Sequence, residues 1–189
     1  MHNKPEPDTR ASQTDRGASP PSGGVAQRGE TPRQLQLFTN TTTYTKTADD
    51  YYTPPEVFQS LNLEFDLDVA APPGGIPWIP AKRYLTIEDD ALSQPWTGRI
   101  WMNPPFSKPS QWIDRFIEHG NGVGLVCTSR ARWFARLWDS QAALIHPHAE
   151  GTMFQFIRDG KRTNIYMPVI FMALGQDNIQ AASRLGRIR

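Results

Sequence analysis

The feature that most limits the possible folds is an alternation of strand-like runs with helical or long connecting segments. The strand-like runs occupy residues 65–71 (FDLDVAA), 82–87 (KRYLTI), 98–102 (GRIWM) and 123–127 (VGLVC). Apolar residues at helical spacing predict a helix over residues 109–120, between the last two runs. Strands that alternate with helices or long crossovers indicate an α/β protein with a mostly parallel sheet.

The first helix is predicted from capping signals. Thr53 is a candidate N-cap, Pro54 suits the first helical position, and Glu56 stands three residues after the cap. This spacing is that of a capping box, so the sequence predicts a short helix from Pro54.

The C-terminal half is expected to complete the sheet with a hairpin. Residues 129–140 (SRARWFARLWDS) have a helical pattern, and residues 143–148 (ALIHPH) are a possible strand. Residues 152–157 and 164–174 flank Asp159-Gly160, a strong hairpin turn signal. We therefore expect the sheet to end in an antiparallel hairpin.

Composition changes along the chain indicate three regions. Residues 1–45 are rich in Pro, Ser, Thr, Gly and Gln and lack apolar periodicity, so they are expected to be a flexible, disordered tail. The folded domain is expected to span residues 46–175, followed by a polar, basic tail at 176–189.

Charge and hydropathy limit the partners. Residues 47–119 carry eleven acidic and five basic side chains, whereas residues 120–189 carry four acidic and nine basic ones. This split suits a cationic small molecule in the first half and a polyanion on the second, although differently solvated faces explain it equally well. No apolar run is long enough to cross a bilayer and no signal peptide is evident, so we expect a cytoplasmic protein.

The segment WMNPPFSKP (101–109) carries the clearest chemical signal. Asn103 follows the strand at 98–102 and is expected at the carboxyl edge of the sheet, where ligands bind in such folds. Its side chain offers an acceptor oxygen, Pro104 and Pro105 present carbonyls without competing N–H groups, and Phe106 adds a flat apolar face. Together they describe a socket for a planar group with an exocyclic amine, such as a purine displaced from a duplex or offered in a single strand.

Five elements in the same order resemble the phage-type DNA N-6-adenine methyltransferase (Dam) family. They are YYTPPEVF at 51–58, FDLDVAA at 65–71, RYLTIEDDAL with a following Trp at 83–96, GRIWMNPPF at 98–106 and the Trp-rich segment around Trp133. The resemblance covers about residues 50–175. It implies a Rossmann-like methyltransferase fold.

The resemblance implies transfer of a methyl group from S-adenosylmethionine to N6 of an adenine flipped out of duplex DNA. It assigns catalysis to Asn103, Pro104, Pro105 and Phe106, with Asn103 and the Pro104 carbonyl accepting the amine hydrogens and Phe106 stacking on the base. Such a site acts by orientation and preorganised acceptors. No metal is required for this chemistry.

Cofactor residues are implied in three segments, of which the middle one has Ala70-Ala71 where related methyltransferases have a GxG loop. Asp68 is placed to face the methionine ammonium of the cofactor, and Asp90 is favoured over Glu88 as the residue that binds its ribose or adenine. The full implied set is Tyr52, Thr53, Pro54, Asp68, Ala70, Glu88 and Asp90. Structural explanations compete with several of these roles, because a capping box already accounts for Thr53 and Pro54 and a solvated turn for part of the acidic triplet at 88–90.

DNA contacts are expected from basic residues after the NPPF segment. The candidates are Lys108, Arg130, Arg132, Arg136, Lys161 and Arg162. Recognition loops are expected among residues 107–111, 129–140 and 150–164. The aromatic face from Trp133 to Trp138 favours core packing over base stacking.

Other readings of the sequence remain open. The enzyme class alternatives are methylation of an RNA base or a protein glutamine, and the non-enzymatic alternative is a catalytically silent DNA-binding relative. His146 and His148 could share a strand face as metal ligands, but clustered partners are lacking in the sequence. Cys127 is interpreted as a buried small hydrophobe.

Overall fold

A computed structural model describes residues 49–148 and 155–189, and the expected tail at residues 1–45 lies outside this part of the chain. Its strands are β1 (Phe65–Asp68), β2 (Ala81–Tyr84), β3 (Ile100–Met102), β4 (Gly122–Cys127), β5 (Ala143–Pro147), β6 (Phe156–Arg158), β7 (Lys161–Thr163), β8 (Val169–Leu174) and β9 (Gly186–Ile188). Its helices are α2 (Pro55–Leu61), α3 (Ser110–His119), α4 (Arg132–Asp139) and α5 (Gln176–Ala182), with short 3₁₀ turns η1 (Ile87–Asp89) and η2 (Ser183–Leu185).

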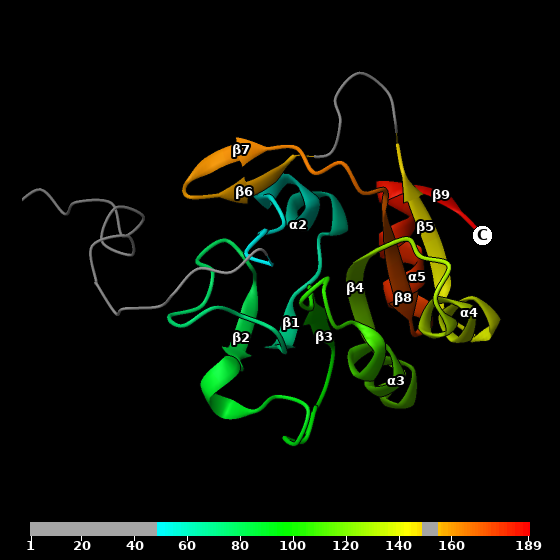
Figure 1. The fold of residues 1–189 in the computed structure, drawn as a ribbon, viewed down its shortest axis with the longest axis horizontal. Coiled ribbons are helices and arrows are strands. Elements are labelled where there is room, and N and C mark those ends of the chain that lie inside the picture. The colour runs from blue at the N-terminus through cyan, green and yellow to red at the C-terminus, as the bar shows by residue number, and fades with distance from the viewer. Residues whose placement is uncertain (1–48, 149–154) are drawn as a thin grey trace, which may run out of the picture.

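The central sheet is mixed and has the strand order β2-β1-β3-β4-β8-β5-β9 (Figure 1). The first four strands in this order pair in parallel. β8 lies between β4 and β5 and is antiparallel to both, and β9 is antiparallel to β5. The predicted α/β class is confirmed, with a parallel half that comes first in the chain and an antiparallel half that follows it.

Helices cover both faces of the sheet. One apolar cluster joins α2 and α5 to the sheet and includes Phe58, Phe65 and Trp101. The other joins α3 and α4 to the opposite face through Ile113, Phe116 and Leu137. Every residue of β4 and β8 is buried, as expected for central strands covered on both sides. Since β1, β3 and β4 run parallel between these two layers of helices, all three end at the same edge of the sheet.

The predicted hairpin is only partly correct. Its turn forms at Asp159-Gly160, where both residues have positive φ angles of 53° and 71°. These angles match a type I′ turn. However, only β6 and β7 pair across it, as a separate two-stranded sheet that Figure 1 shows beside α2. Pro168 cannot donate a ladder hydrogen bond, and the apolar run after it is buried between β4 and β5 instead.

Residues 176–189, which we expected to be a separate basic tail, are part of the folded unit. They form α5, η2 and β9, and β9 is an edge strand of the central sheet. The Asn178 side chain is buried: its amide donates to Leu174 O at 2.6 Å and to Asn121 Oδ1 at 2.8 Å, and its oxygen accepts from Arg99 Nε at 2.6 Å. Side-chain packing and this buried network override a composition that is typical of a tail.

The capping box predicted at Thr53 is wrong. The N-cap residue is Pro54, α2 begins at Pro55, and no side chain caps the helix. Thr53 is buried, and Glu56 forms an ion pair with Arg162 instead of reaching back to the cap. The residue before a proline favours extended backbone, so two consecutive prolines move the helix start one residue later.

Two further features belong to the fold as a whole. Cys127 is buried at the end of β4, and burial is the main cause that raises the pKa of its thiol to about 11. Within residues 49–148 and 155–189, no helix is long and apolar enough to span a bilayer.

Candidate active site

A cavity of about 360 Å³ opens where β1 and β3 end. Residues that follow β1 (Val69 to Pro72) form one wall, and residues that follow β3 (Asn103 to Lys108, with Pro104 and Phe106 not among its lining residues) form another. The volume is at the lower end of the range of roughly 300–1,000 Å³ that is typical of small-molecule sites. The carboxyl edge of parallel strands is the usual ligand-binding edge of such sheets.

Asn103 is held in one orientation at this cavity. Its Nδ2 donates a hydrogen bond of 2.7 Å to the backbone oxygen of Tyr51. That oxygen can only accept, so the amide nitrogen of Asn103 has to face it. The side-chain oxygen Oδ1 is therefore directed elsewhere, and it is buried without a hydrogen-bond partner within the described chain. An unpaired buried acceptor costs about 1–3 kcal/mol, which makes Oδ1 a ready site for an incoming N–H donor.

The three residues after Asn103 have different surroundings. Pro105 lines the cavity, whereas Pro104 is buried and is not among the lining residues. Phe106 is half-buried, and its ring meets the ring of Phe156 edge to face at a centroid distance of 6.0 Å. A ring supported in this way is a rigid apolar surface beside Asn103.

A strap formed by residues 49–53 covers the segment after β3. The Asp49 carboxylate accepts hydrogen bonds from the backbone N–H of Ser107 at 3.0 Å and from its hydroxyl at 2.6 Å. Asp50, Tyr51 and Tyr52 also line the cavity. Of these residues only Tyr52 was predicted. The acidic pair Asp49-Asp50 directly before the YYTPP segment was the signal that sequence reasoning missed.

Two of the predicted cofactor residues in this region lie away from the cavity. The Thr53 side chain is buried, and its hydroxyl has no partner in the described part of the chain. The Thr53 carbonyl accepts from Trp78 Nε1 at 2.9 Å. Pro54 lines a different cavity, between α2 and the end of β5.

Asp68 ends β1 in an apolar environment and is only 3% exposed. Burial raises the pKa of its carboxyl to about 7, and the hydrogen bond of 3.1 Å from the Ala70 N–H offsets only part of this effect. A carboxylate that is this costly to ionise gains the most from a nearby positive charge. Perturbed carboxyls at the ligand edge of a sheet are typical of functional sites.

The three acidic residues after β2 (88–90) have different positions: Asp89 stabilises the local turn, and Asp90 lines the cavity. Asp89 accepts hydrogen bonds from the N–H and hydroxyl of Thr86, both at 2.8 Å, so the capping box of this chain is here. These bonds lower the pKa of the Asp89 carboxyl. Asp90 lines the cavity with Thr86 and Ile87, whereas Glu88 is exposed and is not among the lining residues.

The predicted DNA-binding residues differ in whether a carboxylate already pairs with them. Lys108 lines the cavity, and Arg130, Arg132 and Lys161 are exposed. Arg136 forms a bidentate pair with Asp114 at 2.7 and 2.8 Å, which ties α4 to α3.

Arg162 is also paired. It binds both oxygens of Glu56, the second at 3.1 Å, and this contact lowers the pKa of the Glu56 carboxyl. Arg136 and Arg162 therefore have carboxylate partners that a phosphate would have to replace.

The structure also shows where the aromatic face of α4 and the histidines predicted as possible metal ligands lie. Trp133 and Phe134 pack against the second apolar cluster, in agreement with the core reading, while Trp138 is 42% exposed. His146 is exposed, and within the described residues no group of three or more His, Cys, Asp or Glu side chains is arranged to hold a metal ion.

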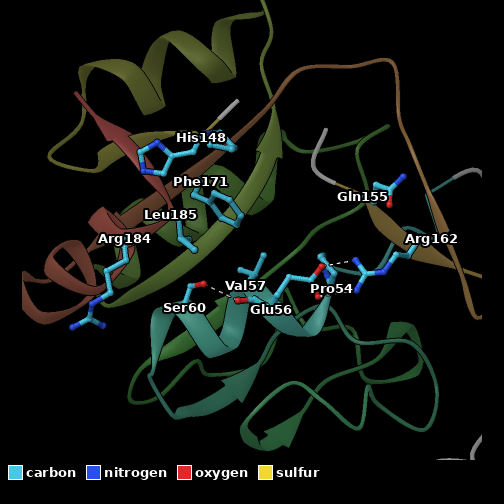
Figure 2. A pocket seen from close by; sticks show the side chains of 11 residues that line it. Pro54, Glu56, Val57, Ser60, His148, Gln155, Arg162, Phe171, Arg184 and Leu185 are labelled. Atoms are coloured by element: carbon cyan, nitrogen blue, oxygen red, sulfur yellow. Dashed lines mark hydrogen bonds and ion pairs between the residues drawn. The ribbon is translucent and has the colours of Figure 1, made fainter. Parts of the chain in front are cut away.

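A second cavity, of about 420 Å³, lies between α2 and the end of β5 (Figure 2). Figure 2 shows Arg162 turned toward Glu56 at one end of it and Arg184 at the other. Arg184 donates to the Leu61 carbonyl at 2.9 Å. His148 and Gln155 line this cavity and border residues 149–154, which lie outside the described chain, so we assign it no ligand.

Comparisons with known proteins identify a family for this chain. Residues 40–160 match the family described as DNA N-6-adenine-methyltransferase (Dam). A relative from Haemophilus phage HP1 (strain HP1c1), named DNA N-6-adenine-methyltransferase, is 35% identical over 109 residues. The match covers 52% of this chain and 61% of that protein, so the chain spans less than two thirds of the length of this relative. No solved structure matches the chain.

Proposed function

The chain belongs to the DNA N-6-adenine-methyltransferase (Dam) family, and we propose that it transfers a methyl group from S-adenosylmethionine to N6 of adenine in DNA. Family membership supports the class of reaction. The cavity beside Asn103 supports the place where it occurs. A phage or prophage enzyme of this kind would act on DNA in the bacterial cytoplasm.

The observation that carries the proposal is the orientation of the Asn103 amide. Its nitrogen is committed to Tyr51 O, and its buried oxygen has no donor in the described chain. An adenine amino group can supply this donor. In free adenine the N6 lone pair is conjugated with the ring and is a poor nucleophile. A hydrogen bond to Oδ1 favours a more tetrahedral nitrogen whose lone pair is available, and the Pro104 carbonyl is proposed to accept the second hydrogen.

The acidic lining of the cavity suits a cationic cofactor. The cavity is lined by Asp49, Asp50 and Asp90 together with apolar atoms of Val69 and Ile87. Asp68 lies buried behind the loop that follows β1. We propose that Asp68 and the Ala70 segment hold the methionine end and that Asp90 holds the ribose or adenine end. S-adenosylmethionine would supply a methyl group on positively charged sulfur: N6 bonds to the methyl carbon as the carbon–sulfur bond breaks, S-adenosylhomocysteine leaves as a neutral thioether, and N6 releases one proton to solvent.

The proposal is tested by mass spectrometry of nucleosides. Unmethylated duplex DNA is incubated with S-adenosylmethionine and the full chain, digested, and assayed for N6-methyladenine. The wild type is expected to produce it, and Asn103→Ala to reduce the rate at least about 100-fold, because the oriented acceptor is lost. Sequencing of the methylated DNA then maps the target site.

The matched control is Asn62→Gly. Asn62 is an exposed asparagine that ends α2 with a φ angle of 50°, a conformation that glycine adopts without strain. This variant should retain full activity. An active Asn103→Ala enzyme would contradict the role of Oδ1. Cofactor binding without methyladenine would favour an RNA base or a protein glutamine as the substrate, and the absence of cofactor binding would favour a silent DNA-binding relative.

A further inference from the structure

The most exposed large apolar side chain in the described chain lies in the loop at residues 164–168, between β7 and β8. Tyr166 is fully exposed to solvent, and its neighbour Met167 is 50% exposed. Single exposed hydrophobic residues are common on proteins. Two adjacent exposed apolar side chains on one loop are less common, and they suggest a contact surface.

The backbone of this loop is anchored on both sides of the exposed pair. Ile165 is half-buried and packs against the apolar cluster that includes Phe65 and Trp101. The Pro168 carbonyl accepts a hydrogen bond of 2.9 Å from the Thr128 N–H. Tyr166 and Met167 therefore project from a loop whose ends are fixed by the core and by the end of β4.

The loop lies at the edge of the sheet that carries the candidate active site. Thr128 follows β4, and β4 is the parallel neighbour of β3, which leads into Asn103. On its other side the loop continues from the hairpin β6–β7. That hairpin is joined to the strap by two backbone hydrogen bonds between Tyr52 and Ile157, of 2.9 and 2.8 Å.

The charge around the exposed pair suits a polyanion. Residues 127–139 and 159–177, the two segments that meet at Thr128 and Pro168, contain five basic and three acidic side chains, and two of the basic ones, Arg136 and Arg162, are paired with Asp114 and Glu56. Exposed Arg130 lies in the first segment and exposed Lys161 in the second. An exposed aromatic side chain on a surface that also carries exposed cations is the usual combination for contact with stacked nucleobases and their phosphates.

We propose that Tyr166, assisted by Met167, enters the base stack of duplex DNA and fills the space that the target adenine leaves. The inference rests on the proposed function and extends it, because it names a residue that promotes displacement of the base. Unstacking a base is costly, and apolar or aromatic wedges that replace the lost contacts offset this cost. Tyr166 contributes to duplex opening and has no part in the methyl transfer itself.

The test compares two DNA substrates that differ only in how easily the target adenine leaves the stack. Oligonucleotides carry the mapped site as a matched duplex or with a mismatched base opposite the target adenine. Tyr166→Ala is expected to lower the methylation rate of the matched duplex about tenfold or more. On the mismatched duplex it should act at nearly the wild-type rate, and Tyr166→Trp should retain activity on both substrates.

Base displacement is also measured without turnover. With 2-aminopurine at the target position, wild-type protein should raise the fluorescence on binding, and Tyr166→Ala should raise it much less at the same fraction of bound DNA. The control is Ile188→Ala, which removes a 46% exposed apolar side chain from the edge strand β9. This control should match the wild type in both assays.

Two outcomes would overturn the inference while the proposed function stands. One is an unchanged rate of Tyr166→Ala on the matched duplex. The other is an equal loss on matched and mismatched duplexes, which would indicate a general binding role. A wild-type protein that makes no N6-methyladenine on either substrate would overturn the proposed function, and the inference with it.

Discussion

At the scale of single residues, Asp68 shows a conflict between stability and binding. Its carboxyl is 3% exposed at the end of β1, and its pKa in the folded protein is about 7, compared with an ordinary value of 3.8. Between pH 3.8 and about pH 7, the Asp68 carboxyl keeps its proton in the folded protein and releases it in the unfolded chain. Stability from this group is therefore lost as the pH rises through that window, and the loss is complete above pH 7.

Asp68→Asn is expected to stabilise the protein at pH 8, because the amide cannot ionise and still accepts from the Ala70 N–H. The free energy of unfolding should rise by about 1–2 kcal/mol at pH 8, and the gain should shrink toward pH 5. Urea unfolding at several pH values measures this change. The same variant should bind S-adenosylmethionine more weakly in calorimetry at pH 8. A gain that does not vary with pH would contradict ionisation as its cause.

The identities of the candidate site residues were easier to predict than their orientations. Asn103 was identified from NPPF, and Asp90, which the sequence favoured over Glu88, lines the cavity whereas Glu88 does not. The contact between Asn103 and Tyr51 joins residues 52 positions apart. No local spacing rule reports such a contact, because it depends on how the strap crosses the end of β3.

At the scale of elements, the hairpin β6–β7 supports both the strap and the NPPF segment (103–106). Phe156 is fully buried and lies edge to face with Tyr51 at 5.9 Å and with Phe106 at 6.0 Å. Arg158 donates to the Tyr51 hydroxyl at 2.8 Å, and its guanidinium lies 4.8 Å from the ring centroid. The hairpin is thus positioned to affect how Tyr51 presents its carbonyl to Asn103.

Phe156→Ala is expected to destabilise the protein by about 3–4 kcal/mol, because it leaves a cavity between two aromatic rings. Its methylation rate should fall further than the loss of folded protein explains, since Tyr51 and Phe106 both lose support. Thermal unfolding and the nucleoside assay measure the two effects. Thr163→Ala is the matched control, because Thr163 pairs with Phe156 across the hairpin and is only half-buried. An equal effect of the control would show that any damage to the hairpin suffices.

The sequence predicted the hairpin turn and missed the destination of the following strand for a physical reason. Asp159-Gly160 determines a turn through local backbone preferences. Whether residues 169–174 pair with β6 or enter the central sheet depends on which arrangement buries them on both faces. That choice is made by packing across the whole domain, which periodicity alone does not report.

At the scale of the whole molecule, residues 176–189 complete the domain that precedes them. Ala181 and Ala182 are buried in the cluster shared with α2, and Asn178 closes a buried network with Arg99 and Asn121. The polar composition of this segment concealed the contribution of a few small side chains.

Deletion of residues 176–189 is expected to destabilise the protein by several kcal/mol and to cause aggregation, because it exposes one apolar face of the sheet. Thermal unfolding and size-exclusion chromatography measure this effect. The control replaces exposed Arg187 with glutamine, which removes charge and keeps the segment. If the segment served only as a basic tail, the truncated protein would remain folded and the charge variant would reproduce its loss of DNA affinity.

Because β8 lies between β4 and β5, the strands of the central sheet cannot pair in the order in which they are synthesised. β4 ends at Cys127, yet its second neighbour ends at Leu174. While the intervening residues emerge from the ribosome, the parallel half of the sheet keeps an unpaired, fully apolar edge strand. An edge of this kind invites pairing with other nascent chains. The residues that line the candidate site are thus translated well before β8, and pairing between nascent chains is expected to be greatest during this interval.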